Sequence, residues 1–213
     1  MKFLIGIDEA GRGPLAGPVA VAAVMVPKYF DWRQVEGARD SKQMSQQARE
    51  RVYRRMRALE RLGALRTAVS FSPASVIDSH GIAHAIRSAL EQSMAKLNAD
   101  PAECDVRLDG LLSAPAQFGV QRTIVGGDDS EPVISLASIA AKVRRDRFMV
   151  RLARAHPAYG FEQHKGYGTV MHREAIRREG FCSEHRTTFC TRLFGIEPEP
   201  EIFAALQSDE ISV

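Results

Sequence analysis

The sequence predicts an α/β fold in which a mixed β-sheet is flanked by helices on both faces. Two apolar runs, residues 3–7 and 19–26, come first and have the composition of buried strands. Further strand patterns then alternate with long helical patterns, which is typical of a sheet covered by helices. We expect residues 1–194 to form one domain and residues 195–213 to be an acidic tail.

The remaining elements are predicted in order along the chain. Residues 65–72 alternate between apolar and polar side chains, as a half-buried strand does. Shorter strands are expected at 106–108 and 121–125, each followed by a glycine-containing turn. Residues 156–168 are rich in glycine, proline and aromatic residues, which indicates a loop. Helices are expected at 43–62, 73–97, 132–155 and 169–179.

The net charge of +3 understates how basic most of the chain is. Residues 195–213 contain acids but no Lys or Arg, so all the basic residues lie within residues 1–194. This distribution favours a nucleic-acid partner. The helix expected at 43–62 has an arginine-rich face, which is either solvated or follows a phosphate backbone.

Composition argues against several other classes of protein. The chain has no apolar run of about 18 residues and no pattern of a secretory leader, so we expect a soluble, cytoplasmic protein. Its three cysteines are odd in number and lack the paired short spacings of zinc sites or disulfide frameworks. The sequence does not demand more than a monomer.

Four acids lie where predicted strands meet glycine-containing turns, namely Asp8, Glu9, Asp109 and Asp128. Strand ends of this kind converge on one crevice in open α/β sheets. Such acids could hold two Mg²⁺ or Mn²⁺ ions, one activating a water and the other stabilising the leaving oxygen of a displacement at phosphorus. Because side chains alternate across a strand, Asp8 and Glu9 would need a bend or bulge to reach one site.

Two glycine-rich segments add groups that suit a phosphodiester. In Gly11-Arg12-Gly13, the glycines let the backbone approach a bulky anion and the arginine offers a planar fork of donors. In His164-Lys165-Gly166-Tyr167-Gly168-Thr169, a flexible backbone presents Tyr167, which could stack on a base or a sugar. Both segments therefore fit a nucleic-acid interface.

The helix expected at 132–155 presents a polar face. Ser135, Ser138, Lys142 and Asp146 are spaced three or four residues apart and so lie along one side. Lys142 then either neutralises a phosphate or pairs with Asp146 on the surface, and the spacing favours neither.

Taken in order, these segments resemble the motifs of bacterial ribonuclease HII, a type 2 ribonuclease H. The motifs are long, keep the family's order and span about residues 3–190, so the match is specific. The matching segments are residues 8–18, 40–43, 108–110, 127–128, 137–146, 164–169 and His185-Arg186. The resemblance implies a ribonuclease H-like fold with a short helical and acidic C-terminal extension.

The resemblance also implies an activity and roles for residues. It implies a metal-dependent endonuclease that cuts the RNA strand of RNA:DNA hybrids and incises 5′ of single ribonucleotides in duplex DNA, leaving 5′-phosphate and 3′-hydroxyl ends. The four acids would be catalytic ligands of Mg²⁺ or Mn²⁺. Gly11-Arg12-Gly13 would sense the 2′-hydroxyl at the junction, and Tyr167 would stack on the following deoxyribose. Lys42 and Lys142 match phosphate-contacting positions, and the other expected binding or supporting residues are Ser41, Ser138, Asp146, His164 and Lys165.

One departure from the family pattern is Gly126, where many relatives have a lysine before the Gly-Asp pair. A positive charge near Asp128 is therefore expected to be missing. Two other functions stay open, another nuclease of ribonuclease H-like fold and a basic nucleic-acid-binding module without catalysis. The Gly11-Arg12-Gly13 loop and Tyr167 argue against the first, and acids that would repel a polyanion unless metals neutralise them argue against the second.

Overall fold

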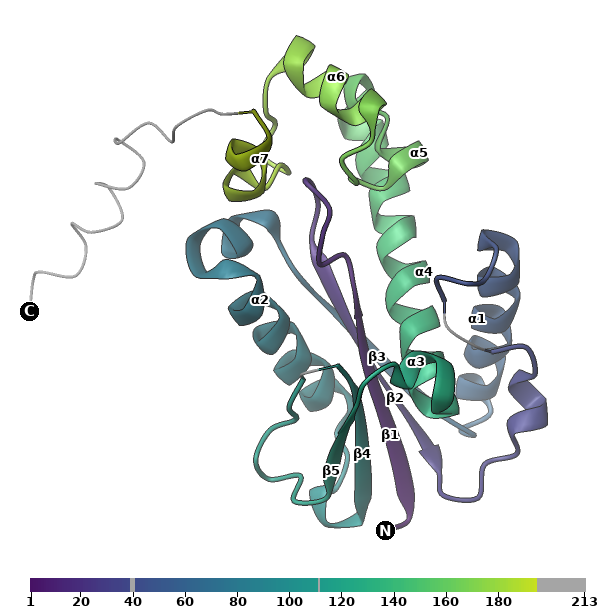
Figure 1. The fold of residues 1–213 in the computed structure, drawn as a ribbon. Coiled ribbons are helices and arrows are strands. Elements are labelled where there is room, and N and C mark those ends of the chain that lie inside the picture. The colour runs from purple at the N-terminus through teal and green to yellow at the C-terminus, as the bar shows by residue number, and fades with distance from the viewer. Residues whose placement is uncertain (39–40, 111, 195–213) are drawn as a thin grey trace, which may run out of the picture.

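A five-stranded mixed sheet forms the centre of the protein in the computed structural model, which describes residues 1–38, 41–110 and 112–194 (Figure 1). The strand order is β3-β2-β1-β4-β5. β2 is antiparallel to both β1 and β3, whereas β4 is parallel to both β1 and β5. The strands are Phe3–Ala10 (β1), Val19–Pro27 (β2), Arg66–Ser72 (β3), Cys104–Asp109 (β4) and Gln121–Ile124 (β5). The predicted α/β fold is confirmed, while Asp40 and the tail expected at 195–213 lie outside the described residues.

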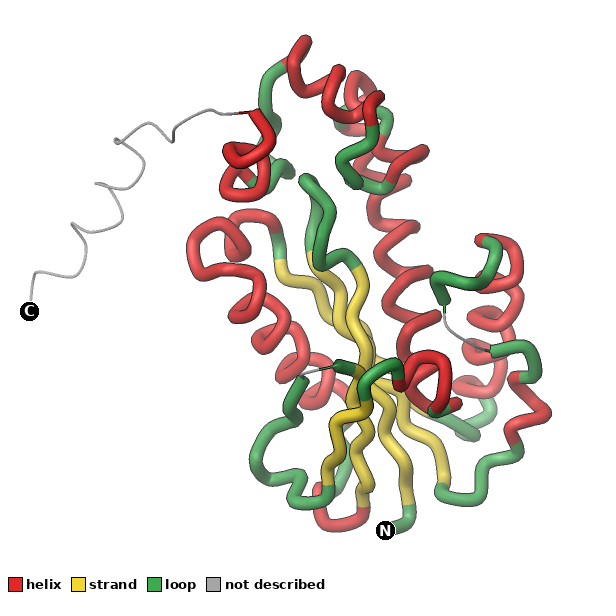
Figure 2. Tube along the Cα trace, viewed as in Figure 1, coloured by secondary structure: helices red, strands yellow, loops and turns green. Residues whose placement is uncertain are grey.

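Helices cover both faces of the sheet (Figure 2). The side chains of β1 alternate between two cores, since Ile5 and Ile7 pack toward α2 whereas Leu4 packs toward α1 and α4. No helix in the described ranges is long and apolar enough to cross a membrane. The helices are Gln46–Arg61 (α1), Ala74–Leu97 (α2), Gly127–Ser130 (α3), Pro132–Ala155 (α4), Phe161–His164 (α5), Val170–Glu179 (α6) and Thr187–Phe194 (α7).

α4 continues past the end of the sheet and meets the C-terminal helices there (Figure 1). Leu15 and Ala16, from the loop after β1, pack in this region against Met149 of α4 and Ile176 of α6. This third apolar cluster attaches α5, α6 and α7 to the loop after β1, which contains Gly11-Arg12-Gly13. The loop therefore lies between the sheet and the C-terminal helices.

Local backbone chemistry explains where the elements differ from the sequence prediction. α1 begins at Gln46 and not at residue 43, because the Ser45 hydroxyl caps it by accepting the Ala48 N–H at 3.2 Å. α2 is interrupted at Gly81, whose φ of 81° is not helical. The loop predicted at 156–168 contains α5 and a short 3₁₀ turn. α4 agrees with the predicted range of 132–155.

Gly6 sets how closely α4 approaches the sheet. A Cβ atom at this residue would lie 2.1 Å from the Val133 carbonyl oxygen in the first turn of α4. Any side chain would therefore push the helix away from β1. Because β1 and the start of α4 both border the acids described below, this contact also fixes the site.

We expect Gly6→Ala to destabilise the fold by roughly 1–3 kcal/mol or more, because backbone atoms of α4 must move to admit the methyl group. Urea unfolding followed by circular dichroism measures this change. Gly119→Ala is the matched control, since its Cβ would meet nothing within 4 Å. Equal unfolding midpoints for the two variants would show that the β1–α4 contact is not tight.

Candidate active site

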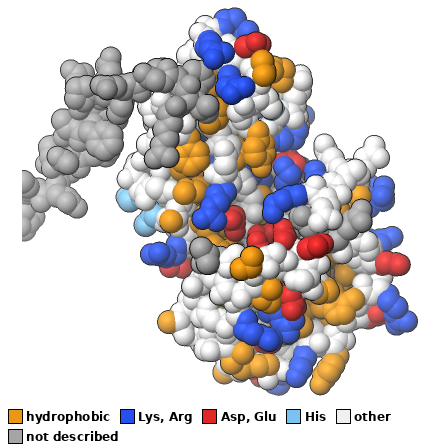
Figure 3. All heavy atoms as spheres, in the orientation of Figure 1, with side chains coloured by type: hydrophobic (Ala, Val, Ile, Leu, Met, Phe, Trp, Pro, Cys, Tyr) orange, Lys and Arg blue, Asp and Glu red, His pale blue; other side chains and the backbone are white. Residues whose placement is uncertain are grey.

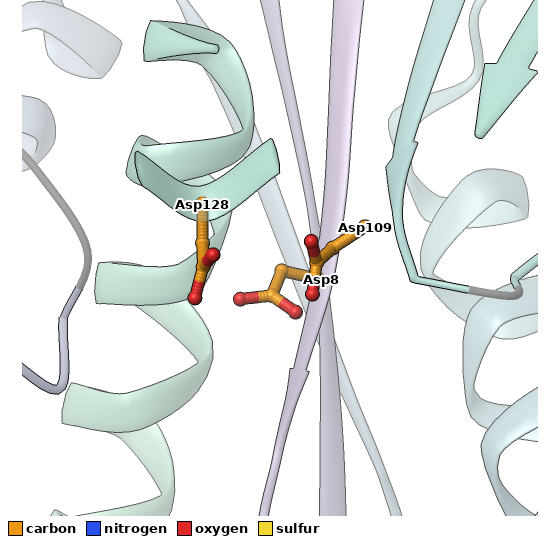
Figure 4. A group of neighbouring side chains, drawn as sticks. All are labelled: Asp8, Asp109 and Asp128. Carbon is orange, nitrogen blue, oxygen red and sulfur yellow. The ribbon is translucent and has the colours of Figure 1, made fainter. Parts of the chain in front are cut away.

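Three aspartates converge near the C-terminal ends of β1 and β4 (Figure 4). Asp8 lies in β1, Asp109 is the last residue of β4, and Asp128 lies in α3. One carboxylate oxygen from each lies within 4.8 Å of those of the other two. Asp8 and Asp128 are buried and Asp109 is half-buried.

Strand register brings the first two acids together. β1 and β4 are parallel neighbours, and Ile7 lies opposite Leu108. Both of these residues pack on the α2 side of the sheet, so the residues that follow them, Asp8 and Asp109, face α4. Their convergence follows from the alternation of side chains in two paired strands.

The third acid comes from a helical turn and not from a strand end. α3 is held against β4 because the Gly127 N–H donates to Asp109 Oδ1 at 2.8 Å. α3 is also held against α4, because Ser135 Oγ donates to the Asp128 carbonyl oxygen at 2.8 Å. The exposed Asp129, which follows, is not part of the cluster.

Glu9 is not part of this cluster. The register of β1 with β2 is uninterrupted, with Asp8 opposite Ala22 and Glu9 opposite Val21, so no bulge separates these two residues. Glu9 Oε1 accepts a hydrogen bond from Arg12 Nη1 at 3.3 Å. Burial raises the pKa of the Glu9 carboxyl, Arg12 opposes that shift, and the charge of Asp109 adds to it. Glu9 therefore remains within electrostatic reach of the cluster.

Burial and neighbouring acids together destabilise the charged form of Asp8. Burial raises the pKa of Asp8 to about 8, and the charges of Glu9 and Asp109 add to the effect, while a hydrogen bond from Ser138 opposes it. A carboxyl with this pKa is mainly protonated at neutral pH unless a cation neutralises its surroundings. Three carboxylates within reach of one point are a donor set that fits a hard divalent cation.

Lys42 supplies the positive charge that Gly126 does not. Its Nζ lies 3.0 Å from Asp128 Oδ2, so the expectation of a missing charge near this acid is wrong. Gly126 has a φ of 68°, a conformation that a side chain disfavours. The neighbouring Ser41 is buried and shares a hydrogen bond of 2.8 Å with Ser138 Oγ on α4.

Lys142 lies between Asp146 and Tyr167. Its Nζ donates to Asp146 Oδ1 at 2.8 Å and lies 5.6 Å from the centre of the Tyr167 ring. The sequence left open whether Lys142 neutralises a phosphate or pairs with Asp146, and the structure shows the pair with Asp146. This pair is largely buried, and Asp146 Oδ2 also lies 3.8 Å from Arg49 Nη2. Tyr167 is 42% exposed, so its ring is accessible from outside. A contact of Lys142 with phosphate stays a prediction.

The loop that carries Tyr167 is shaped from within by His164. Its Nδ1 accepts the Gly166 N–H at 3.2 Å, and its Nε2 donates to the Tyr159 carbonyl oxygen at 2.7 Å. His164 is buried, so it supports the loop and is not exposed to a ligand. The side chain of Lys165 bonds the carbonyl oxygens of Glu162 and Gln163.

Most of the α1 arginines remain open to either interpretation. Arg51, Arg54 and Arg55 are exposed, as both a solvated face and a phosphate-binding face require. Arg49 is different, because its Nη1 donates to the Ser41 and Met44 carbonyl oxygens. It therefore braces the segment that carries Lys42. On the face shown in Figure 3, acidic side chains gather near the middle and basic side chains lie beside them.

Two buried arginines were not predicted as site residues. Arg145 and Arg186 are fully buried and donate to main-chain carbonyl oxygens, most of them in the loop after β1. Both lie in segments that resemble the motifs of the family named above. The available signal for Arg145 was its spacing of four from Met149 and Ala141, on a buried stripe of α4.

Comparison with known proteins identifies a family that matches most of this chain. A family model described as ribonuclease HII matches residues 5–193. Curated ribonuclease HII proteins from Bacillus anthracis and Bacillus thuringiensis are each 42% identical over 189 residues, which is 89% of this chain and 69% of theirs. A chain in the structure of the PCNA:RNase HII complex from Archaeoglobus fulgidus has a TM-score of 0.70 at 25% identity, covering 86% of this chain and 93% of that chain.

More distant structures share the fold alone. Bst-RNase HIII in complex with Mn²⁺ has a TM-score of 0.64 at 20% identity, covering 88% of this chain and 64% of that chain. The family match spans nearly all the described residues, including the three aspartates and both glycine-rich loops. The chain therefore belongs to the ribonuclease HII family and is an endoribonuclease of the ribonuclease H type.

Proposed function

We propose that the protein is a metal-dependent endonuclease that hydrolyses the RNA strand of RNA:DNA hybrids and incises 5′ of single ribonucleotides in duplex DNA. The products would carry 5′-phosphate and 3′-hydroxyl ends. The convergence of Asp8, Asp109 and Asp128 is the observation that carries the proposal, because phosphodiester hydrolysis by divalent cations needs such a cluster. Membership of the family supports the same class of substrate.

The three aspartates would hold Mg²⁺ or Mn²⁺, and Glu9, whose carboxyl lies within electrostatic reach of Asp109, would be the fourth acidic ligand. When bound, such ions polarise the phosphodiester and offset the charge that develops during hydrolysis. The chain keeps the carboxylates in place through main-chain donors. The Glu9 N–H bonds Asp8 Oδ1 at 2.7 Å, as Gly127 does for Asp109. The bond from the Glu9 N–H also favours the charged form of Asp8, which a cation requires.

Recognition of the ribose would fall to the two glycine-rich loops. Gly13 is exposed and its α-carbon faces open space, so a sugar-phosphate backbone can come close to it. Tyr167 presents its ring for stacking, and Lys142 can exchange its bond with Asp146 for one with a phosphate. In this arrangement the 2′-hydroxyl is recognised and is not the nucleophile.

Cleavage mapping tests the proposal. The substrates are a duplex with one ribonucleotide, a uniform RNA:DNA hybrid and an all-DNA duplex, each with Mg²⁺, with Mn²⁺ and with a chelator. We expect incision of the first two only, and only with a metal. Cleavage that persists in chelator, or that leaves a cyclic phosphate, would contradict it.

Neighbouring acids give a matched pair of variants. We expect Asp128→Asn to lower kcat by at least about a hundredfold, because it removes a ligand charge with little change of shape. Asp129→Asn should be close to wild type, since Asp129 is exposed and outside the cluster. Single-turnover cleavage of a hybrid measures both. The reverse order of effects would show that the wrong acid has been assigned.

Gly13→Ala tests whether substrate approaches the loop closely. The added Cβ meets nothing within 4 Å in the free protein, so the fold should be unchanged while kcat/KM falls. Gly11→Ala is unsuitable because its Cβ would lie 2.0 Å from Arg145 Nε. Unchanged kcat/KM on both ribonucleotide substrates would remove the loop from the proposed interface.

Tyr167→Ala should weaken the preference for a junction. Loss of stacking costs about 1–3 kcal/mol, and a single embedded ribonucleotide has the fewest other ribose contacts to compensate. We therefore expect kcat/KM to fall more on that substrate than on a uniform hybrid, with both assayed at one salt concentration. Equal losses would mean that Tyr167 serves general binding or loop stability.

A further inference from the structure

Arg186 holds the glycine loop by its carbonyl oxygens. This fully buried side chain donates from Nη2 to Gly11 at 2.7 Å, from Nη1 to Arg12 at 3.0 Å and from Nε to Gly17 at 2.9 Å. The C=O and N–H of a trans peptide point in opposite directions. Because Arg186 binds the Gly11 and Arg12 carbonyls, it turns the N–H groups of Arg12 and Gly13 away from itself. Those are the donors that a ligand approaching Gly13 would meet.

His185, the preceding residue, is connected to the other loop through His172. Its Nδ1 accepts the Cys182 N–H at 2.9 Å, so its proton is on Nε2 and is donated to His172 Nε2 at 3.1 Å. His172 Nδ1 then donates to the Tyr167 carbonyl oxygen at 3.0 Å. Burial lowers the pKa of both histidines to about 4, which keeps this relay neutral.

Main-chain bonds join the same segments. The Leu15 N–H donates to the Gly166 carbonyl at 2.8 Å, and the Arg186 N–H donates to the Leu15 carbonyl at 2.7 Å. Arg145 adds bonds to the carbonyls of Lys165 and Ala16. The two loops and residues 184–186 are therefore one hydrogen-bonded unit.

We propose that His185 and Arg186 are positioning residues that hold the Gly11-Arg12-Gly13 loop and Tyr167 in a fixed relation, and thereby set the preference for an RNA–DNA junction. One dipeptide can do this because its two side chains reach different loops. The inference rests on the proposed function, in which these loops read adjacent sugars. A change in their spacing weakens simultaneous contact with both sugars before it affects the aspartates, which are held by other elements.

The first test needs no substrate. We expect Arg186→Lys and His185→Leu to speed amide hydrogen exchange at Leu15 and Gly17 by about tenfold or more, with little change in the β1–β2 ladder. A lysine ammonium cannot span three carbonyls, and leucine donates nothing to His172. His185→Gln, which keeps an N–H near the position of Nε2, should restore slow exchange. Unchanged exchange in the loops, or an equal increase throughout the sheet, would overturn the inference.

Matched controls come from other parts of the fold. Arg66→Lys removes an arginine that donates to the Leu97 carbonyl at 2.9 Å, at the other end of β3 from the site. His84→Leu removes a histidine of α2 whose ring stacks on that of His80, with the ring centres 4.9 Å apart. Neither change should alter exchange at Leu15 or Gly17.

The second test measures selectivity, as the ratio of kcat/KM on a single embedded ribonucleotide to that on a uniform hybrid. We expect this ratio to fall by about fivefold in Arg186→Lys and in His185→Leu. In a Tyr167→Ala background, His185→Leu should lower it no further, because His185 acts through Tyr167. If Tyr167→Ala lowers the ratio and the positioning variants do not, the inference is wrong. If Tyr167→Ala leaves the ratio unchanged, the proposed function fails instead, and exchange alone decides whether the dipeptide holds the loops.

Discussion

Mutual repulsion among buried carboxylates is the constraint on which this site depends. Carboxylate oxygens of Asp8, Asp109 and Asp128 come within 4.8 Å of one another, where burial already disfavours the charge of Asp8. Flexible side chains on loops would separate under this repulsion. Here paired strands, the close approach of α4 at Gly6 and the bonds that hold α3 prevent separation. The rigid ends of β1 and β4 keep the carboxylates together, where they are available for a cation.

Buried positive charge has a different role beside the loop after β1. Arg145 and Arg186 are buried without a carboxylate at hydrogen-bond distance among the described residues, and carbonyl oxygens satisfy their donors instead. A guanidinium that binds carbonyls keeps its charge while it orders the backbone. The aspartates therefore provide charge that a cation can bind, whereas the two arginines fix the shape of a loop.

Periodicity and turn chemistry made much of the fold predictable. The range of α4 could be predicted because Pro132 marks its start and a long apolar stripe defines its length. Asp8 and Asp109 could be placed at a sheet edge because each follows a buried strand. The position of Asp128 in α3 could not be predicted, since the sequence Gly126-Gly127-Asp128 is as typical of a turn as of the start of a short helix. Nor could the burial of Arg186, because its partners lie about 170 residues away in sequence and the chain is rich in arginine.

This separation in sequence also orders the assembly of the site. The acid cluster and the bonds that hold it involve residues up to Ser138. The glycine loop, by contrast, gains its buried guanidinium only from residue 186, and contacts between distant residues carry the largest entropy cost of closure. A chain emerging from the ribosome thus contains every member of the acid cluster 58 residues before it contains Arg186. The glycine loop can therefore gain these three hydrogen bonds only after residue 186 has been synthesised.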